Sequence, residues 1–108
     1  SASKFAVVGL TQATAMDLAP YNITVNAGCP GPINTDRMSY WERDKAQELG
    51  ITQEEFRSQV VDSSAQGTPL GRIAESEDVA NMVAFLAGDD ASFITGQSYN
   101  VNGGQLFH

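Results

Sequence analysis

The sequence predicts an α/β fold with a parallel sheet, on three observations. A helical pattern over residues 2–18 precedes a β-branched, nearly uncharged segment at 23–29. Such a segment is typical of a strand buried on both faces in a parallel sheet. A second helical pattern at 75–87 precedes a short strand pattern at 97–101. The order of helix, strand, helical insert, helix and strand is that of half of an α/β sheet.

Composition limits what the chain can be. Its 108 residues are enough for one small domain, and 42% of them are hydrophobic, as in a folded chain. Thirteen acidic residues against six basic ones give a net charge of −7, which argues against a nucleic-acid binder. No apolar run approaches the ~20 residues of a membrane span. The composition therefore predicts neither a nucleic-acid nor a membrane partner.

The single cysteine and the first residues bear on location and completeness. One cysteine, Cys29, excludes an internal disulfide and a cysteine-built zinc site, and it fits a reducing compartment, so we expect a cytoplasmic protein. The chain begins at Ser1 without a Met or an apolar leader segment and enters a helical pattern directly. We therefore expect a fragment of a longer protein.

The helix expected at 2–18 carries one face of very small residues. Ala2, Ala6, Gly9 and Ala13 recur at intervals of three or four residues. A mid-helix glycine costs about 1 kcal/mol relative to alanine, so its presence needs a packing reason. Close approach of a second helix is one explanation, and packing of the helix on a sheet of the same chain is the other.

The strand expected at 23–29 runs into a rigid turn. Two prolines flank a glycine in Pro30-Gly31-Pro32, which forbids both a helix and a central strand there. The turn therefore lies at the carboxyl end of the strand. Asn26, polar in this uncharged strand, is either a satisfied buried amide, a turn-directing side chain or a functional group.

Residues 34–68 interleave charged with aromatic residues and predict two helices, 35–49 and 52–63. Thr52 and Glu55 have the spacing of a capping box, which favours a helix start there. Because the segment follows the carboxyl end of a strand, we expect a flap over a site.

The helix expected at 75–87 begins with acidic residues, which suit the positive end of the helix dipole, and it ends at Gly88. The strand at 97–101 leads into the tight turn Asn102-Gly103-Gly104.

The titratable residues by themselves indicate little chemistry. His108 is the only histidine and is terminal, so we expect neither a Ser-His-Asp triad nor a histidine metal cluster, and no metal site. The carboxylates lie mostly on expected helix faces and at helix starts, where we expect them to be solvated.

The ordered motifs, however, resemble those of a known family. They are Ser-Ala-Ser-Lys-Phe-Ala, Asn-Ile-Thr-Val-Asn-Ala-Gly-Cys-Pro-Gly, Pro-Leu-Gly-Arg, Glu-Asp-Val-Ala and Ile-Thr-Gly-Gln-Ser-Tyr-Asn-Val-Asn-Gly-Gly. Together they resemble the carboxy-terminal half of the short-chain dehydrogenase/reductases, over essentially all of the chain. Lys-Phe-Ala-Val-Val-Gly-Leu-Thr-Gln and Asp-Leu-Ala-Pro are most similar to the acetoin reductase and 2,3-butanediol dehydrogenase group, and 3-oxoacyl reductases are somewhat less similar.

The resemblance implies a Rossmann-like, doubly wound parallel sheet, of which this chain is the carboxy-terminal portion. Residues 1–108 would be the carboxy-terminal part of a single dinucleotide-binding domain, with residues 34–68 as a helical substrate lid. The glycine-rich pyrophosphate turn of such a domain lies in the amino-terminal half.

The resemblance also assigns a catalytic role to Lys4. The family motif is Tyr-x-x-x-Lys, and Lys4 matches the lysine if a tyrosine stands immediately before Ser1. Residues four apart share a helix face, so the ammonium could lower the pKa of the phenol from about 10 and hold the ribose hydroxyls of the cofactor. The pattern alone favours an exposed lysine in the first turn of a helix.

Further site residues follow from the same resemblance. Pro30 and Gly31 match the turn beside the nicotinamide, while the backbone of Ile33 and the hydroxyl of Thr35 match contacts to the carboxamide. Thr35 is equally suited to be the N-cap of the next helix. We expect Met38, Tyr40 and Trp41 either to line or cover a small polar substrate or to pack the lid on the protein body.

The resemblance implies an oxidoreductase that transfers a hydride between NAD or NADP and a small secondary alcohol, diol or hydroxyketone. The subgroup favours NAD. The alternatives are a 3-oxoacyl reductase-like enzyme, a catalytically silent nucleotide-binding relative and a piece that serves oligomerisation only. We expect the 108 residues alone to be inactive. The family further implies a homotetramer or homodimer, with the small-residue helix face, the closing strand and the tail Gln105 to His108 in contact with a partner subunit.

Overall fold

The structure is a computed structural model that describes residues 2–35 and 39–107. The chain divides into two compact units. The first comprises Ser1–Cys29 and Asp78–Val101, and the second comprises Pro30–Glu77 and Asn102–His108.

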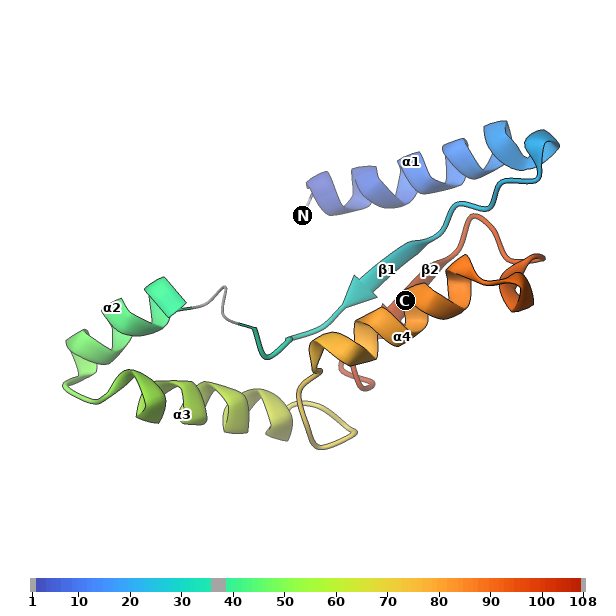
Figure 1. The fold of residues 1–108 in the computed structure, drawn as a ribbon. Coiled ribbons are helices and arrows are strands. Elements are labelled where there is room, and N and C mark those ends of the chain that lie inside the picture. Colours follow the sequence, from blue (N-terminus) through green and yellow to red (C-terminus); the bar gives the residue numbers. More distant parts are fainter. Residues whose placement is uncertain (1, 36–38, 108) are drawn as a thin grey trace. The chain divides into compact units, whose positions relative to one another are not determined.

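The first unit contains a small parallel sheet with helices (Figure 1). Its strands β1 (Ala27–Pro30) and β2 (Ser98–Val101) are hydrogen-bonded neighbours. The helices are α1 (Ala2–Leu18), α4 (Ser76–Ala87) and the short 3₁₀ turns η1 (Ala19–Tyr21) and η3 (Asp89–Ala91). The predicted α/β class is therefore confirmed.

The first strand is shorter than the sequence predicts. Residues 23–26 are not strand, and β1 begins at Ala27. Side chains replace part of the backbone ladder before that point: the Thr95 hydroxyl accepts the Val25 N–H at 2.9 Å, and the Asn26 carboxamide accepts the Gln97 N–H at 3.1 Å. The β-branched composition of residues 23–26 did not reveal that side-chain hydrogen bonds take the place of backbone ones there.

Helix α4 packs close to β1. A Cβ placed on Gly28 would lie 2.7 Å from Cε of Met82, so the absence of a side chain allows this approach. The helix begins at Ser76 and ends before Gly88, within one residue of the expected bounds.

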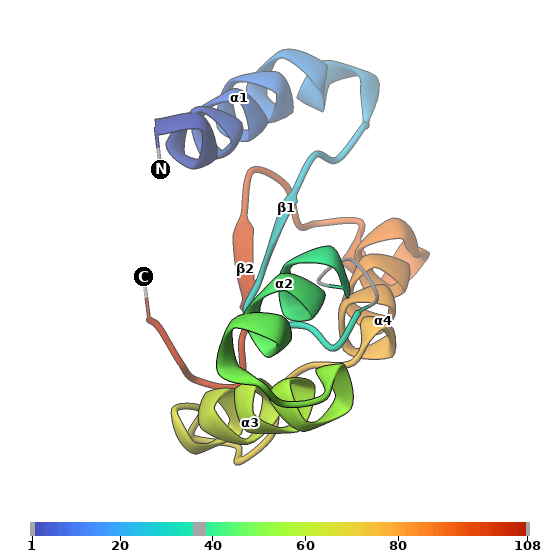
Figure 2. The ribbon, with the colours of Figure 1, turned by 90° about the vertical axis from the view of Figure 1, so that its left-hand side faces the viewer.

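The second unit is built around two helices, α2 (Ser39–Leu49) and α3 (Gln53–Gln66), which lie side by side (Figure 2). Thr52 is the N-cap of α3, and its hydroxyl accepts the Glu55 N–H at 3.1 Å, which confirms the predicted helix start. The helix runs three residues beyond the expected end at Ser63.

The turn at 102–104 closes the second unit. The Gly103 carbonyl accepts the Leu70 N–H at 3.1 Å, and Gly104 donates its N–H to the Asn102 side chain at 3.1 Å. Both glycines have positive φ, 62° and 89°, a conformation that other residues rarely adopt. The turn is thereby attached to the connector that follows α3.

Candidate cofactor turn and helical insert

Within the second unit, a parallel bridge holds the turn that follows β1. Ile33 pairs with Ala74; the Pro32 carbonyl accepts the Ala74 N–H at 3.1 Å, and Asn34 donates its N–H to the Ala74 carbonyl at 2.9 Å. In such a bridge the residues on either side of Ile33 make the bonds, so the N–H and carbonyl of Ile33 itself point away from Ala74. One side of this turn is fixed, and the other presents backbone polar groups.

Gly31 is the point of closest approach in the turn. A Cβ at this position would lie 2.8 Å from Cβ and 3.0 Å from Cα of Asn102. Because one of these atoms is backbone, a side chain at Gly31 would have to displace the closing turn. The glycine therefore allows the two turns to pack together.

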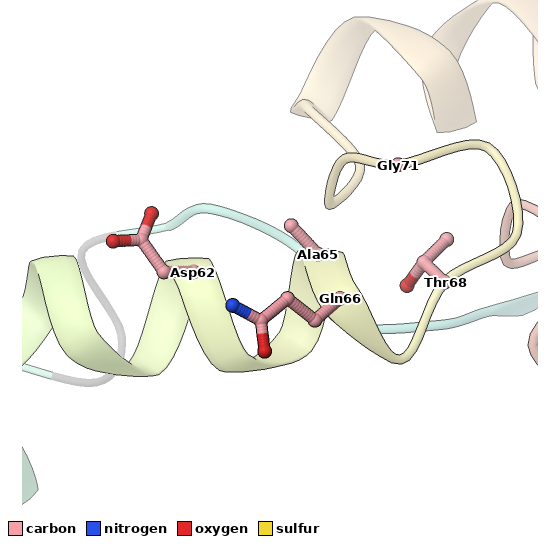
Figure 3. A pocket seen from close by; sticks show the side chains of 5 residues that line it. All are labelled: Asp62, Ala65, Gln66, Thr68 and Gly71. Atoms are coloured by element: carbon pink, nitrogen blue, oxygen red, sulfur yellow. The ribbon is translucent and has the colours of Figure 1, made fainter.

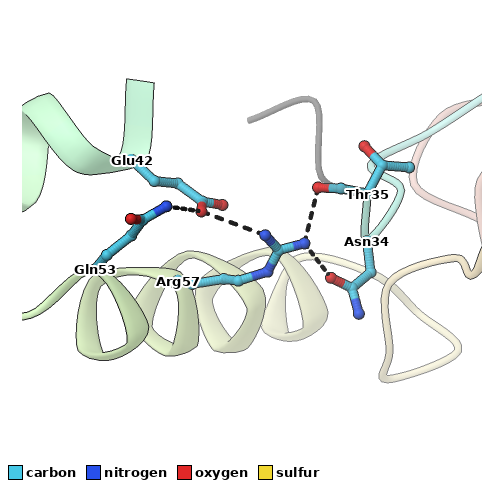
Figure 4. A network of polar contacts seen from close by, with 5 residues as sticks. All are labelled: Asn34, Thr35, Glu42, Gln53 and Arg57. Atoms are coloured by element: carbon cyan, nitrogen blue, oxygen red, sulfur yellow. Dashed lines mark hydrogen bonds and ion pairs between the residues drawn. The ribbon is translucent and has the colours of Figure 1, made fainter. Parts of the chain in front are cut away.

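In addition to the bridge with Ala74 and the contact with Asn102, Arg57 of α3 holds the turn (Figure 4). Its Nη2 donates to Oδ1 of Asn34 at 2.6 Å and to the backbone carbonyl of Thr35 at 2.8 Å. Its Nη1 donates to Oε2 of Glu42 in α2 at 3.3 Å. One guanidinium thus contacts both the turn and the other helix of the pair.

Glu42 departs from the expectation that the carboxylates are solvated. It is 1% exposed, the most buried large side chain among the described residues. Gln53 donates to the same oxygen as Arg57, at 3.5 Å, so the buried carboxylate is paired and hydrogen-bonded. No sequence signal singles out Glu42, because the burial of Ala46 on the same helix face is itself visible only in the structure.

The aromatic residues predicted to face a substrate differ in their surroundings. Trp41 packs edge-on against Phe56 of α3, with ring centroids 5.2 Å apart, and is half exposed. Tyr40 is largely exposed and has the Arg43 guanidinium 5.9 Å from its ring centroid. Met38 lies outside the described residues, as does the segment where an N-cap role of Thr35 would be visible.

The remaining predicted residues lie in the first unit. Lys4 is exposed in the first turn of α1. Asn26 donates to the Ile94 carbonyl at 3.0 Å and accepts from Gln97, so its amide is satisfied within the chain.

The small-residue face of α1 is also exposed. The residues of α1 that are buried are Thr11 and Ala15, on the opposite side, while a Cβ on Gly9 would meet nothing within 4 Å. Packing of this face on the sheet of the same chain, one of the two explanations considered, is therefore wrong for the described residues.

A separate pocket of 430 Å³ lies at the end of α3 (Figure 3). Its lining residues are Asp62, Ala65, Gln66, Thr68 and Gly71. The lining has a carboxylate and no basic group, so it does not suit the phosphates of a dinucleotide. None of the predicted site residues lines it.

The chain is similar to known proteins over nearly all of its length. A family model described as enoyl-(acyl carrier protein) reductase matches residues 1–105. A short-chain dehydrogenase/reductase from Armillaria gallica is 42% identical over 107 residues, covering 99% of this chain and 38% of the relative. The chain belongs to the short-chain dehydrogenase/reductase family.

Two other members of the short-chain dehydrogenase/reductase family carry more specific information. The diacetyl reductase [(S)-acetoin forming] of Staphylococcus aureus is 45% identical, with 97% of this chain and 39% of the relative covered. A solved short-chain dehydrogenase structure from Francisella tularensis superposes with a TM-score of 0.81 at 35% identity, over 95% of this chain and 41% of that one. The chain thus spans about two fifths of the relatives that it matches. The predicted Rossmann-like fold is confirmed.

In the part of the chain that the structure describes, no helix has the length and apolar character needed to cross a membrane. Within the same residues, no group of three or more histidine, cysteine or acidic side chains is arranged to hold a metal ion.

Proposed function

We propose that this chain is the carboxy-terminal part of an NAD(P)-dependent oxidoreductase that acts on a small secondary alcohol, diol or hydroxyketone. In this proposal residues 1–108 belong to one dinucleotide-binding domain, and residues 34–68 form its substrate lid. The family and the similarity to an acetoin-forming diacetyl reductase support the substrate class. The same similarity favours acetoin-like substrates over larger ones.

The orientation of the Ile33 backbone is the observation that carries the proposal. Its N–H and carbonyl point away from the bridge with Ala74. The turn is held in place by that bridge, by the close approach of Gly31 to Asn102 and by the hydrogen bonds of Arg57. A carboxamide needs one donor and one acceptor, which a fixed backbone supplies without any particular side chain. The residues present therefore fit a nicotinamide carboxamide, with Thr35 as a second donor and with Pro30 and Gly31 beside the ring.

The chemistry divides between cofactor and protein. When bound, the nicotinamide gives or takes the hydride. In this proposal Lys4 would hold the ribose hydroxyls and, if a tyrosine stands immediately before Ser1, would also lower the pKa of its phenol. That phenol would then exchange a proton with the substrate oxygen. Tyr40, Trp41 and Met38 cover the substrate.

The test uses the full-length protein with NADH and NADPH, and with diacetyl, acetoin, 2,3-butanediol and a 3-oxoacyl thioester. We expect turnover of a diketone or hydroxyketone with one of the cofactors. Lys4→Met should lower kcat about 100-fold or more, the size of a general acid–base contribution, without loss of helical circular dichroism.

The matched control is Lys45→Met, which removes a lysine in α2 that forms an ion pair with the exposed Glu48. We expect its kcat to stay close to that of the natural protein. Equal losses in the two lysine variants, or absence of cofactor binding by the full-length protein, would refute the assignment.

Two alternatives have their own outcomes in the same experiment. A preference for the 3-oxoacyl thioester would favour an acyl reductase, in line with the description of the matching family model. Cofactor binding with no turnover of any substrate would favour a catalytically silent relative.

The assembly is a proposal as well. The exposed small-residue face of α1 and the exposed tail residues Leu106 and Phe107 support contact with a second subunit in a homodimer or homotetramer.

A further inference from the structure

We propose that Arg57 is a positioning residue that couples the helical lid to the cofactor turn, so that cofactor bound at the turn orders α2. The inference rests on the proposed function, since it takes residues 33–35 as the cofactor contacts and residues 34–68 as the lid. Neither the motifs nor the predicted site residues include Arg57.

The two terminal nitrogens of the Arg57 guanidinium bind different parts of the chain. Nη2 serves the turn, through Oδ1 of Asn34 and the carbonyl of Thr35 at 2.6 and 2.8 Å. Nη1 serves α2, through the carboxylate of Glu42 at 3.3 Å. A planar fork with nitrogens in fixed positions can make these bonds at once, which a lysine ammonium cannot do in the same way.

The two ends of the guanidinium differ in their exposure to solvent. Glu42 is almost completely buried, so its charge needs Arg57 and Gln53 in place. The Asn34 side chain is exposed and is also a donor to Glu75 at 3.4 Å. The bond to Glu42 is therefore shielded from water, and the bond to Asn34 is open to it.

The proposed coupling runs from the turn, through the Arg57 guanidinium, to α2. A carboxamide held on the Ile33 backbone would fix the peptide units that follow, including the Thr35 carbonyl that Arg57 binds. A fixed carbonyl fixes the guanidinium, and the guanidinium fixes Glu42 and with it α2. By linkage, a lid that is ordered in advance should favour the cofactor in turn.

The experiment measures amide hydrogen exchange of residues 39–49 in the full-length protein, with and without NADH or NADPH. In the natural protein we expect cofactor to slow exchange in this segment. In Arg57→Lys, which keeps a positive charge beside Glu42, we expect the cofactor still to bind but its effect on exchange to fall about fivefold or more, the lower end of typical coupling. The KM for substrate should rise by a similar factor.

A second variant guards against a fold defect. Pairing Arg57→Gln with Glu42→Gln removes the buried charge together with its partner, so no uncompensated ion remains. It should also lose the cofactor effect on residues 39–49. The matched control Lys45→Gln removes a cation from α2 outside the network and should keep the full effect. A structural role alone would alter exchange equally with and without cofactor.

The outcomes separate the two proposals. If the cofactor binds and slows exchange as strongly in both Arg57 variants as in the natural protein, or if it slows nothing in the natural protein, the coupling is wrong while the function stands. If neither cofactor binds the natural protein, the proposed function itself is wrong.

Discussion

Two glycines near the carboxyl end of β1 differ in what surrounds them. Gly28 faces the far end of a flexible methionine side chain, Met82. Gly31 faces the Cα and Cβ of Asn102, which can move only with the closing turn. A side chain at Gly28 could therefore be accommodated by a movement of Met82, whereas a side chain at Gly31 could not be accommodated without a backbone shift.

This difference predicts unequal effects of adding one methyl group. Gly31→Ala should lower the free energy of unfolding by about 1–3 kcal/mol, the usual cost of overpacking, because backbone must shift. Gly28→Ala should cost clearly less, since Met82 can change rotamer. Denaturant titration of the full-length variants measures both. A Gly31→Ala protein as stable as Gly28→Ala would show that the approach of the two turns is not close.

At the scale of elements, the α2–α3 pair has a small apolar contact beside its ionic one. Phe56 is 8% exposed and packs against Trp41, while Tyr40 on the neighbouring position is 79% exposed. Phe56 therefore contributes to the stability of the helix pair, whereas the exposed Tyr40 ring is available for the substrate contact proposed above.

Substitution to alanine should separate these roles. Phe56→Ala should cost about 3 kcal/mol of unfolding free energy, at the low end for a buried phenylalanine. Tyr40→Ala should leave stability nearly unchanged because the ring is exposed, but it should raise the KM for substrate if Tyr40 covers the site. Thermal unfolding and steady-state kinetics of the same preparations distinguish them. A destabilised Tyr40→Ala with an unchanged KM would contradict the lid assignment.

For the molecule as a whole, α1 presents apolar surface that the described chain does not cover. Phe5, Leu10 and Met16 are 78%, 68% and 78% exposed, around the small-residue face. Isolated apolar side chains at a surface need no explanation, but a continuous face that includes Gly9 is typical of an interface. The chain spans about two fifths of its relatives, so in the proposed longer protein either additional chain or a second subunit would cover this face.

A larger side chain in place of Gly9 tests whether a second subunit covers this face. Gly9→Leu removes the cost of a mid-helix glycine and adds bulk to the face, so α1 itself should be no less stable. In the full-length protein we expect the assembly to dissociate into smaller species, as measured by sedimentation velocity. The control Ser58→Leu adds the same bulk to an exposed position of α3 and should leave the assembly intact. An unchanged sedimentation coefficient for Gly9→Leu would argue against a subunit contact through this face.

Local patterns were enough to predict the α/β class, four of the helices, the capped start at Thr52 and the family, because periodicity, capping and ordered motifs are properties of short stretches of the chain. It did not determine the start of β1, where the side chains of Thr95 and Asn26 replace ladder bonds across a sequence separation of about 70 residues.

The burial of Glu42 and its link through Arg57 to the turn became visible only in the folded chain. Glu42 and Arg57 are fifteen residues apart on different helices, and Asn34 is farther still. A charged residue looks the same in the sequence whether water or a guanidinium solvates it. Burial depends on which helices pack together, and packing is a property of the folded chain.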